Sequence, residues 1–549
     1  MTQSLTDYDA IVVGAGAGGG VAAALLAEAG KRVLLLERGR QLSFADVGRD
    51  HLRNQRLAQY GFNAGPDDLN GNPRVFVTPE GLEKVVSPIE SGYSANAACV
   101  GSGTRVYGAQ AWRFLPGDFR MASRYGVPNG SSLADWPISY EDLAPHYERA
   151  EWEMGVSGDE ETAGKHRPRH RPYPMPPLPL NAQGRTLQAG ADALGWDTQR
   201  VPLLINSVPY GGREACVHCQ QCVGFACPTD AKNGTQNTLI PRALATGLCT
   251  LETEAMAERI DTDTSGSVVG VTYWTKDGNR VSAKSAVVVV SGGAIETARL
   301  LLNSKSSAHP HGLGNKYDQV GRNLQGHYYA GAVGWMPEPI WDGIGPGATT
   351  ATIKFSHDNG EKIVGGGMLA DDFIVQPIHF QKGRVPAGVP RWGLAHKQWM
   401  RRFYTRMLLI TGPVQEIPSP DARVSVDPNV TDKYGIPVAR LSGTAHPETL
   451  RTYAFMSARA AEWAEACGGE SVQAYSAGLS LSGGQHQAGT CRMGGDPQTS
   501  VTDEWGRVHG HDNLYIADGS LHVTNGGFNP VLTILALSYR VAGHLIAAW

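Results

Sequence analysis

Three glycines near the start of the chain and one acid beyond them have the spacing of a dinucleotide-binding turn. Gly14, Gly16 and Gly19 follow the apolar run 10–13, and Glu37 lies 18 residues after Gly19. Gly14 permits a tight turn, Gly16 lets the backbone approach a pyrophosphate at a helix N-terminus, and Gly19 allows close packing of helix on strand. Glu37 is placed to accept a hydrogen bond from a ribose 2′-hydroxyl, so the pattern predicts dinucleotide binding.

A second candidate site is a cluster of cysteines. Four of the eight cysteines fall within twelve positions, at Cys216, Cys219, Cys222 and Cys227, and Pro228 follows. The spacing differs by one residue from the bacterial ferredoxin run, so an iron–sulfur cluster is one hypothesis. Zinc is another, although the ligands lie closer together than two separated C-x2-C pairs. The interpretation that we favour is structural thiols, or a disulfide, in a loop between domains.

The glycine turn needs a strand before it and a helix after it, and the sequence supplies both. Residues 10–13 and 33–37 are apolar runs typical of buried strands, and residues 21–29 between them have a helical pattern. Two more buried-strand patterns end in small-residue turns, at 286–290 and at 514–517. Because a parallel sheet can be assembled from distant segments, we expect a discontinuous nucleotide-binding domain.

Composition limits the other classes of function. The chain has 549 residues, of which 41% are hydrophobic and 18% charged, which is enough for a folded core. Its net charge is −4 and it has no run of basic residues, so we expect no nucleic-acid partner. No apolar run reaches about 20 residues, and the N-terminus lacks the cationic region of a signal peptide. We therefore expect a cytoplasmic protein with no membrane partner.

Over nearly its whole length the chain resembles the glucose-methanol-choline (GMC) oxidoreductases. The segments that carry the resemblance are 14–37, 99–104, 135–143, 291–302 and 486–542. It implies an α/β fold, α+β overall, with a Rossmann-like FAD-binding domain and a substrate domain built on an antiparallel sheet with flanking helices. We expect residues 1–160, 225–325 and 484–549 to form the FAD-binding domain, and residues 161–224 and 326–483 to form the substrate-binding domain.

The resemblance also assigns two catalytic residues. Oxidising an alcohol requires a base near the hydroxyl proton while hydride passes to a flavin nitrogen. His486 matches the catalytic histidine of the family, and Asn529 matches its partner, which can donate to and accept from the substrate oxygen. Asn529 would also cap a helix with Pro530 at its first position, aiming the positive helix end at the flavin. His327 resembles a family position that we interpret as structural.

Other matching residues imply the contacts to the cofactor. Residues 98–112 match the region against the flavin ring, and residues 97–112 contain no histidine, so we expect FAD to be bound non-covalently. Residues 518 and 519 match a turn that contacts the flavin. The expected cofactor-binding residues are Gly14, Gly16, Gly19, Glu37, Gly101, Gly103, Thr104, Asp518, Gly519, Asn529 and Pro530.

Segments 223–228 and 233–238 are similar to those of bacterial sugar and glycoside oxidases. They imply oxidation of a hydroxyl of a sugar or glycoside, at ring C2, C3 or a similar position, with dioxygen or an artificial or protein electron acceptor. Alternatives are oxidation of a non-carbohydrate alcohol or, from another class, a flavin-binding lyase or electron-transfer subunit. Five aromatic residues could stack on a sugar but are more often core residues: Trp335, Trp341, Trp392, Trp399 and Tyr404.

Overall fold

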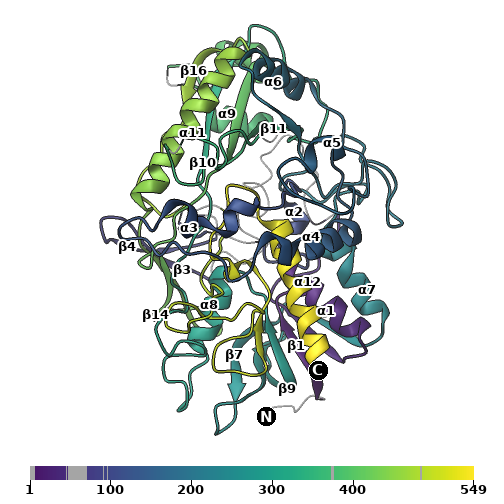
Figure 1. Ribbon diagram of the computed structural model, residues 1–549, viewed down its shortest axis with the longest axis vertical. Coiled ribbons are helices and arrows are strands. Elements are labelled where there is room, and N and C mark those ends of the chain that lie inside the picture. The colour runs from purple at the N-terminus through teal and green to yellow at the C-terminus, as the bar shows by residue number, and fades with distance from the viewer. Residues whose placement is uncertain are drawn as a thin grey trace.

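The computed structural model describes residues 7–44, 46, 71–88, 90, 92–94, 97–360, 362–371, 376–386, 388–482 and 485–549. The predicted domain limits at residues 1 and 484 lie outside these residues. Three sheets and their covering helices form an elongated molecule, with the largest sheet at one end and the antiparallel sheet of six strands at the other (Figure 1).

The seven-stranded sheet is assembled from three distant parts of the chain. Its strands are β1 (Tyr8–Val13), β2 (Val33–Glu37), β6 (Cys249–Thr253), β7 (Met256–Thr262), β8 (Val268–Trp274), β9 (Arg280–Val290) and β17 (Leu514–Ile516). The order is β6-β2-β1-β9-β8-β7, and β17 also pairs with β9. The end of β9 runs parallel to both β1 and β17, with Val290 beside Val13 and Ile516. The parallel pairing of distant segments is thus confirmed, while β7 and β8 extend the sheet with antiparallel strands.

Helix α1 (Ala17–Glu28) follows the glycine turn and lies along α12 (Val531–Ala548), which in turn contacts α4 (Tyr140–Met154) (Figure 1). The start of α1 also lies close to the end of β17: a Cβ on Gly18 would lie 1.6 Å from the carbonyl oxygen of Ala517 and 2.9 Å from Oγ of Ser538 on α12. Of the helices in the described part of the chain, α12 is the one long and apolar enough to cross a membrane, yet 61% of it is buried inside the protein. It occupies the position of a core helix.

The six-stranded antiparallel sheet has helices on both faces. Its order is β16-β10-β13-β12-β11-β5, formed by β5 (Gln199–Arg200), β10 (Tyr329–Trp335), β11 (Thr350–Thr352), β12 (Leu369–Asp371), β13 (Met407–Pro413) and β16 (Glu470–Ala474). Leu408 of β13 faces α6 (Ala182–Ala193) and α11 (Pro447–Ala466), whereas Leu409 faces α9 (Pro377–Gly383) and α10 (Gly393–Phe403). This alternation is the period of two expected of a strand.

A four-stranded sheet of order β14-β15-β3-β4 connects the two ends. It pairs β14 (Arg423–Thr431) and β15 (Pro437–Ser442) with β3 (Arg74–Val77) and β4 (Glu83–Val86), and α8 (Ala294–Asn303) contacts β14 and β15. The shorter helices are α2 (Gly103–Val106), α3 (Met121–Tyr125), α5 (Glu160–Ala163) and α7 (Leu239–Ala245). The domain boundaries given above stay a prediction.

Candidate active site

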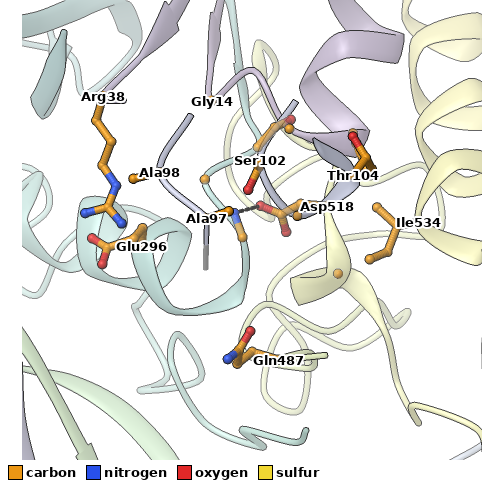
Figure 2. Close-up of a pocket in the computed structure, with 18 of the residues that line it drawn as sticks. Gly14, Arg38, Ala97, Ala98, Ser102, Thr104, Glu296, Gln487, Asp518 and Ile534 are labelled. Carbon is orange, nitrogen blue, oxygen red and sulfur yellow. Dashed lines mark hydrogen bonds between the residues drawn. The ribbon is translucent and has the colours of Figure 1, made fainter. Parts of the chain in front are cut away.

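One continuous cavity of about 330 Å³ contains most of the residues singled out in the sequence. Among its lining residues are Gly14, Gly16, Glu37, Gly103, Thr104, His486, Asp518, Gly519, Asn529 and Pro530. Ser102, Thr104, Asp518 and Ile534 surround one part of this space, while Arg38 and Glu296 face each other beside it (Figure 2). Gly19 and Gly101 do not line the cavity but lie behind its wall. Segments from both halves of the chain therefore form a single site.

The glycine turn has the shape of an anion cradle. Gly14 has a φ of +102°, and a Cβ there would lie 2.4 Å from the carbonyl oxygen of Ser291. A Cβ on Gly19 would lie 1.8 Å from the oxygen of Gly14, so Gly19 sets the close packing of α1 on the turn. Gly16 directly precedes α1 and lines the cavity. The backbone N–H groups at the start of α1 thus adjoin the cavity, as binding of a pyrophosphate requires.

Glu37 ends β2 and is buried at the cavity wall. Its Oε2 accepts the backbone N–H of Ala15 at 2.9 Å, and its Oε1 accepts that of Gly39 at 2.8 Å. These bonds hold the carboxylate beside the glycine turn. Each carboxylate oxygen can accept more than one hydrogen bond, so Glu37 keeps acceptor capacity for a ribose hydroxyl.

Asp518 joins β17 to α8. Its Oδ2 accepts the N–H of Gly293 at 2.9 Å and the hydroxyl of Thr297 at 2.6 Å, and its Oδ1 accepts from the backbone and hydroxyl of Ser520. Burial raises the pKa of Asp518, although these four hydrogen bonds oppose that shift. The carboxylate fixes the turn, and Gly519 places backbone at the cavity.

The loop before α2 closes over the glycine turn from the opposite side. The N–H of Gly101 donates to the carbonyl oxygen of Ala15 at 2.8 Å. Gly101 has a φ of +87°, and a Cβ there would lie 2.3 Å from Oε1 of Gln236. The hydroxyl of Thr104 donates to the oxygen of Gly101 at 2.6 Å. Gly101 therefore acts by shaping the loop that brings Gly103 and Thr104 to the cavity.

A buried ion cluster in the cavity wall was not expected from the sequence. Glu296 of α8 pairs with Arg74 and lies close to Arg38 and Arg299 (Figure 2). Burial alone would raise the pKa of Glu296, but the three guanidinium groups hold it well below its usual range. No local motif marks this cluster, because Arg74 and Glu296 come from segments more than 200 residues apart.

The backbone of His486 is held in a conformation that few side chains adopt. Its φ is +66°, in the left-handed region. The side-chain amide of Asn525 donates to the carbonyl oxygen of His486 at 2.7 Å. Gln325 and Ala488 exchange two backbone hydrogen bonds directly after it, at 2.9 and 3.0 Å. Neighbouring segments thus enforce the strained conformation, as occurs at functional sites.

The side chain of His486 is oriented by a second histidine. Nε2 of His327 lies 2.8 Å from the carbonyl oxygen of Gly526 and 3.1 Å from that of Asn525, so this nitrogen must carry a proton. Burial lowers the pKa of His327 to about 4, which leaves its Nδ1 unprotonated at neutral pH. That Nδ1 lies 2.9 Å from Nδ1 of His486. His486 therefore donates from Nδ1, and in the neutral imidazole its acceptor nitrogen is Nε2.

The same region contains a third histidine, for which the sequence suggested no role. His522 is completely buried, and its Nδ1 lies 3.0 Å from Oδ1 of Asn525. Asn525 also donates to the carbonyl oxygens of Gly326 and His486. His522 thus orients the Asn525 amide, which links the backbones at Gly326 and His486. Burial lowers the pKa of His522 to about 4.

Asn529 faces the cavity beside His486, but it does not cap the helix. Helix α12 begins at Val531 with Pro530 as its N-cap, one residue later than the sequence predicted, and no side chain caps it. The amide of Asn529 instead donates from Nδ2 to the hydroxyl of Tyr329 at 3.2 Å. Tyr329 also lines the cavity, with its ring centre 6.0 Å from that of His486. Sequence analysis missed Tyr329 because no local pattern marks it.

The four clustered cysteines surround a separate, much smaller cavity. The four cysteines of the cluster are free thiols, so no disulfide forms there. Burial raises the pKa of Cys216 to about 11 and that of Cys222 to about 12. Nζ of the buried Lys232 donates to the backbone oxygens of Tyr107, Cys222 and Phe225. Within the described residues no three His, Cys, Asp or Glu side chains are placed to hold a metal, which gives no support to iron–sulfur or zinc.

Comparison with protein families agrees with this geometry. Residues 135–329 and 418–538 match the two GMC oxidoreductase domains, and residues 12–75 match an NAD(P)-binding Rossmann-like domain. The chain belongs to the GMC oxidoreductase family. The resemblance seen in the sequence is thereby confirmed, as are the oxidoreductase class and the α/β fold, and the family match supports the expected FAD.

Relatives of this GMC oxidoreductase align over almost the whole chain. The 6'''-hydroxyparomomycin C oxidase of Streptomyces lividus is 31% identical, covering 98% of this chain and 92% of the relative. The fructose dehydrogenase large subunit of Gluconobacter japonicus is 28% identical, covering 100% and 99%. The structure of formate oxidase from Aspergillus oryzae superposes with a TM-score of 0.65 at 15% identity, covering 100% and 99%, which shows a shared fold.

Proposed function

We propose that this GMC oxidoreductase binds FAD non-covalently in the described cavity and oxidises a hydroxyl group of a sugar or glycoside to a carbonyl. The observation that carries the proposal is the contact of His486 with His327: it directs Nδ1 of His486 to His327, in a histidine that lines the same cavity as the glycine turn. The names of the two relatives, a hydroxyparomomycin oxidase and a fructose dehydrogenase, support a carbohydrate-like substrate.

The residues of the cavity fit FAD. Gly14 permits a turn in which a Cβ would strike the backbone of Ser291, Gly16 lines the cavity at the start of α1, and Glu37 offers an acceptor to the ribose. No histidine occurs in residues 97–112, the segment that would lie against the ring, which supports non-covalent binding. When bound, FAD supplies the acceptor for the hydride that leaves the carbinol carbon.

His486 would remove the hydroxyl proton through Nε2 as the C–H bond breaks and the C=O bond forms. His327 would hold the resulting imidazolium in place, because its Nδ1 lone pair continues to accept from Nδ1–H of His486. Asn529, oriented by Tyr329, would position the substrate oxygen. The N–H groups in the first turn of α12 would stabilise negative charge that develops at this end of the cavity.

The proposal is tested by adding sugars, glycosides, diols and simple alcohols anaerobically to the purified holoenzyme and then admitting air. We expect sugars or glycosides to bleach the flavin absorbance and air to restore it. If air does not restore the flavin absorbance but an artificial or protein electron acceptor does, the enzyme is a dehydrogenase rather than an oxidase. Faster bleaching by simple alcohols would reassign the substrate class. A flavin that no alcohol bleaches would favour a lyase or an electron-transfer subunit.

A further inference from the structure

The segment 376–415 has an unusual charge for this protein. It contains seven lysines and arginines and no aspartate or glutamate, in a chain whose net charge is −4. Three of these cations lie on α10, at Lys397, Arg401 and Arg402, and all three are exposed. None of the three forms an ion pair within the described part of the chain. Helix α10 therefore presents positive charge that no carboxylate of the described residues pairs with.

Two large apolar side chains lie next to these cations. Trp392, directly before α10, is 84% exposed, the highest value among the large apolar residues that the structure describes. Leu394, in the first turn, is 71% exposed. We call Trp392, Leu394, Lys397, Arg401 and Arg402 the α10 surface. Exposed tryptophan and leucine beside several cations mark an interaction surface and are unusual on a free monomer.

The opposite side of α10 explains why the helix has a fixed orientation. Trp399 packs on Phe380 with ring centres 5.3 Å apart and on Trp335 at 5.7 Å, and Phe403 packs on Trp335 at 5.4 Å. Trp341 and Tyr404 pair in the same cluster, so of the five aromatic residues considered for sugar stacking only Trp392 lies outside it. The inner face anchors α10 to the sheet, and the α10 surface remains outward.

The location of α10 separates this surface from the reaction. Tyr329, at the start of β10, lines the catalytic cavity, whereas Trp335, at the end of the same strand, contacts α10. Six residues of extended strand span about 20 Å. None of the residues of the α10 surface lines the catalytic cavity. A partner bound to the α10 surface would thus leave the catalytic pair uncovered.

We propose that the α10 surface docks this enzyme on an anionic lipid bilayer. Cations near such a bilayer each contribute about 1 kcal/mol, and indole and leucine side chains enter the boundary between headgroups and acyl chains. A second copy fits less well, because a two-fold interface would oppose identical cations. An acidic protein partner would complement the positive charge of the α10 surface, but its binding would not require two exposed apolar side chains. This proposal departs from the sequence expectation of no membrane partner, which rested on spanning segments.

Vesicle co-sedimentation of the FAD-loaded enzyme tests the proposal. We expect binding to mixed phosphatidylcholine and phosphatidylglycerol vesicles at low salt, weak binding to phosphatidylcholine alone, and loss of binding at high salt. Lys397→Gln, Arg401→Gln and Arg402→Gln together should lower the partition constant about a hundredfold, which corresponds to about 1 kcal/mol for each cation. Trp392→Ser with Leu394→Ser should lower it about tenfold and keep the salt dependence.

A matched control removes the same number of positive charges from other parts of the protein surface. Lys276→Gln, Lys284→Gln and Lys305→Gln remove three exposed cations from outside the α10 surface and should bind vesicles like the parent enzyme. Flavin content and turnover of soluble substrate should be unchanged in all variants, which shows that they are folded. A blue shift of tryptophan emission on binding should disappear in Trp392→Phe.

Three results would overturn the proposal. The first is that the parent enzyme does not bind the mixed vesicles. If it binds soluble polyglutamate instead, the partner is an acidic protein. The second is equal loss of binding in the control triple. The third is a dimer in solution that Trp392→Ser with Leu394→Ser dissociates, which would assign the surface to a second copy.

Discussion

Nδ1 of His327 lies 2.9 Å from Nδ1 of His486, and this contact determines which nitrogen of His486 can take a proton. Two carbonyl oxygens fix the proton of His327 on its Nε2, so its Nδ1 must accept. A histidine that lines no part of the catalytic cavity thus sets the tautomer of one that does.

The first prediction concerns that contact. His327→Ala removes the acceptor for Nδ1–H of His486 and should slow flavin reduction by about a hundredfold through loss of the favoured tautomer. His327→Gln should recover most of the rate, because its amide can accept from His486 and donate to the carbonyl oxygens. Stopped-flow reduction at equal flavin content measures both. Equal rates for the alanine and glutamine variants would contradict a positioning role.

The second prediction concerns stability at acidic pH. The pKa values of His327 and His522 are lowered to about 4 by burial, below the ordinary value of 6.5. Between pH 6.5 and pH 4 the unfolded chain binds protons that the folded protein does not, so the free energy of unfolding falls as pH falls through this window. Each histidine should lower the free energy of unfolding by about 3 kcal/mol between pH 6.5 and pH 4, and should not change it above pH 6.5.

Denaturant titration at several pH values measures this dependence. His327→Gln should reduce the acid-side slope of the free energy of unfolding, whereas His170→Gln, at an exposed position, should leave it unchanged. A slope that is the same in His327→Gln and in the parent would show that His327 is not kept neutral by the fold.

The third prediction concerns Tyr329. Tyr329→Phe removes the acceptor for the side-chain amide of Asn529 and leaves the ring in place. The lost hydrogen bond is worth about 1 kcal/mol, so kcat/KM should fall about fivefold with FAD still bound. Steady-state kinetics on the substrate found in the panel test this. An unchanged kcat/KM would mean that Asn529 is oriented by other contacts.

The fourth prediction concerns the glycine turn. In Gly19→Ala the new Cβ would lie 1.8 Å from the carbonyl oxygen of Gly14, so α1 must move away from the turn. We expect loss of bound FAD and a decrease of about 1–3 kcal/mol in the free energy of unfolding. Gly164→Ala is the control, because its Cβ meets no atom within 4 Å and its φ is −74°. Full flavin content in Gly19→Ala would contradict the account of the turn.

The elements that could be predicted are those whose signal is local. The run 10–13, the glycines after it and Glu37 lie within one strand–turn–helix–strand unit, and their spacing alone indicates the fold around them. The strand patterns at 286–290 and 514–517 are recognisable for the same reason, and both strands join this sheet. Local patterns do not, however, fix a helix start to one residue, and α12 begins one residue later than predicted.

The contacts that decide the chemistry are not local. His327 and His486 are 159 residues apart, and Asn529 and Tyr329 are 200 apart. Each pair forms because the antiparallel sheet and the C-terminal segment meet at the cavity, which no periodicity in a single chain reveals. The cysteine cluster shows the reverse case, in which a suggestive spacing corresponds to no metal-holding arrangement among the described residues.

The most direct test of the central claim is the rate of anaerobic flavin reduction in His486→Ala, compared with the parent enzyme at equal FAD content. A positioned general base is worth about 10² to 10⁴ in rate, and we predict a loss of that size with FAD still bound. Because the proton is taken at His486, the pH dependence of the parent rate should also disappear in the variant. A variant that reduces its flavin at the parental rate would contradict the assignment of His486 as the base.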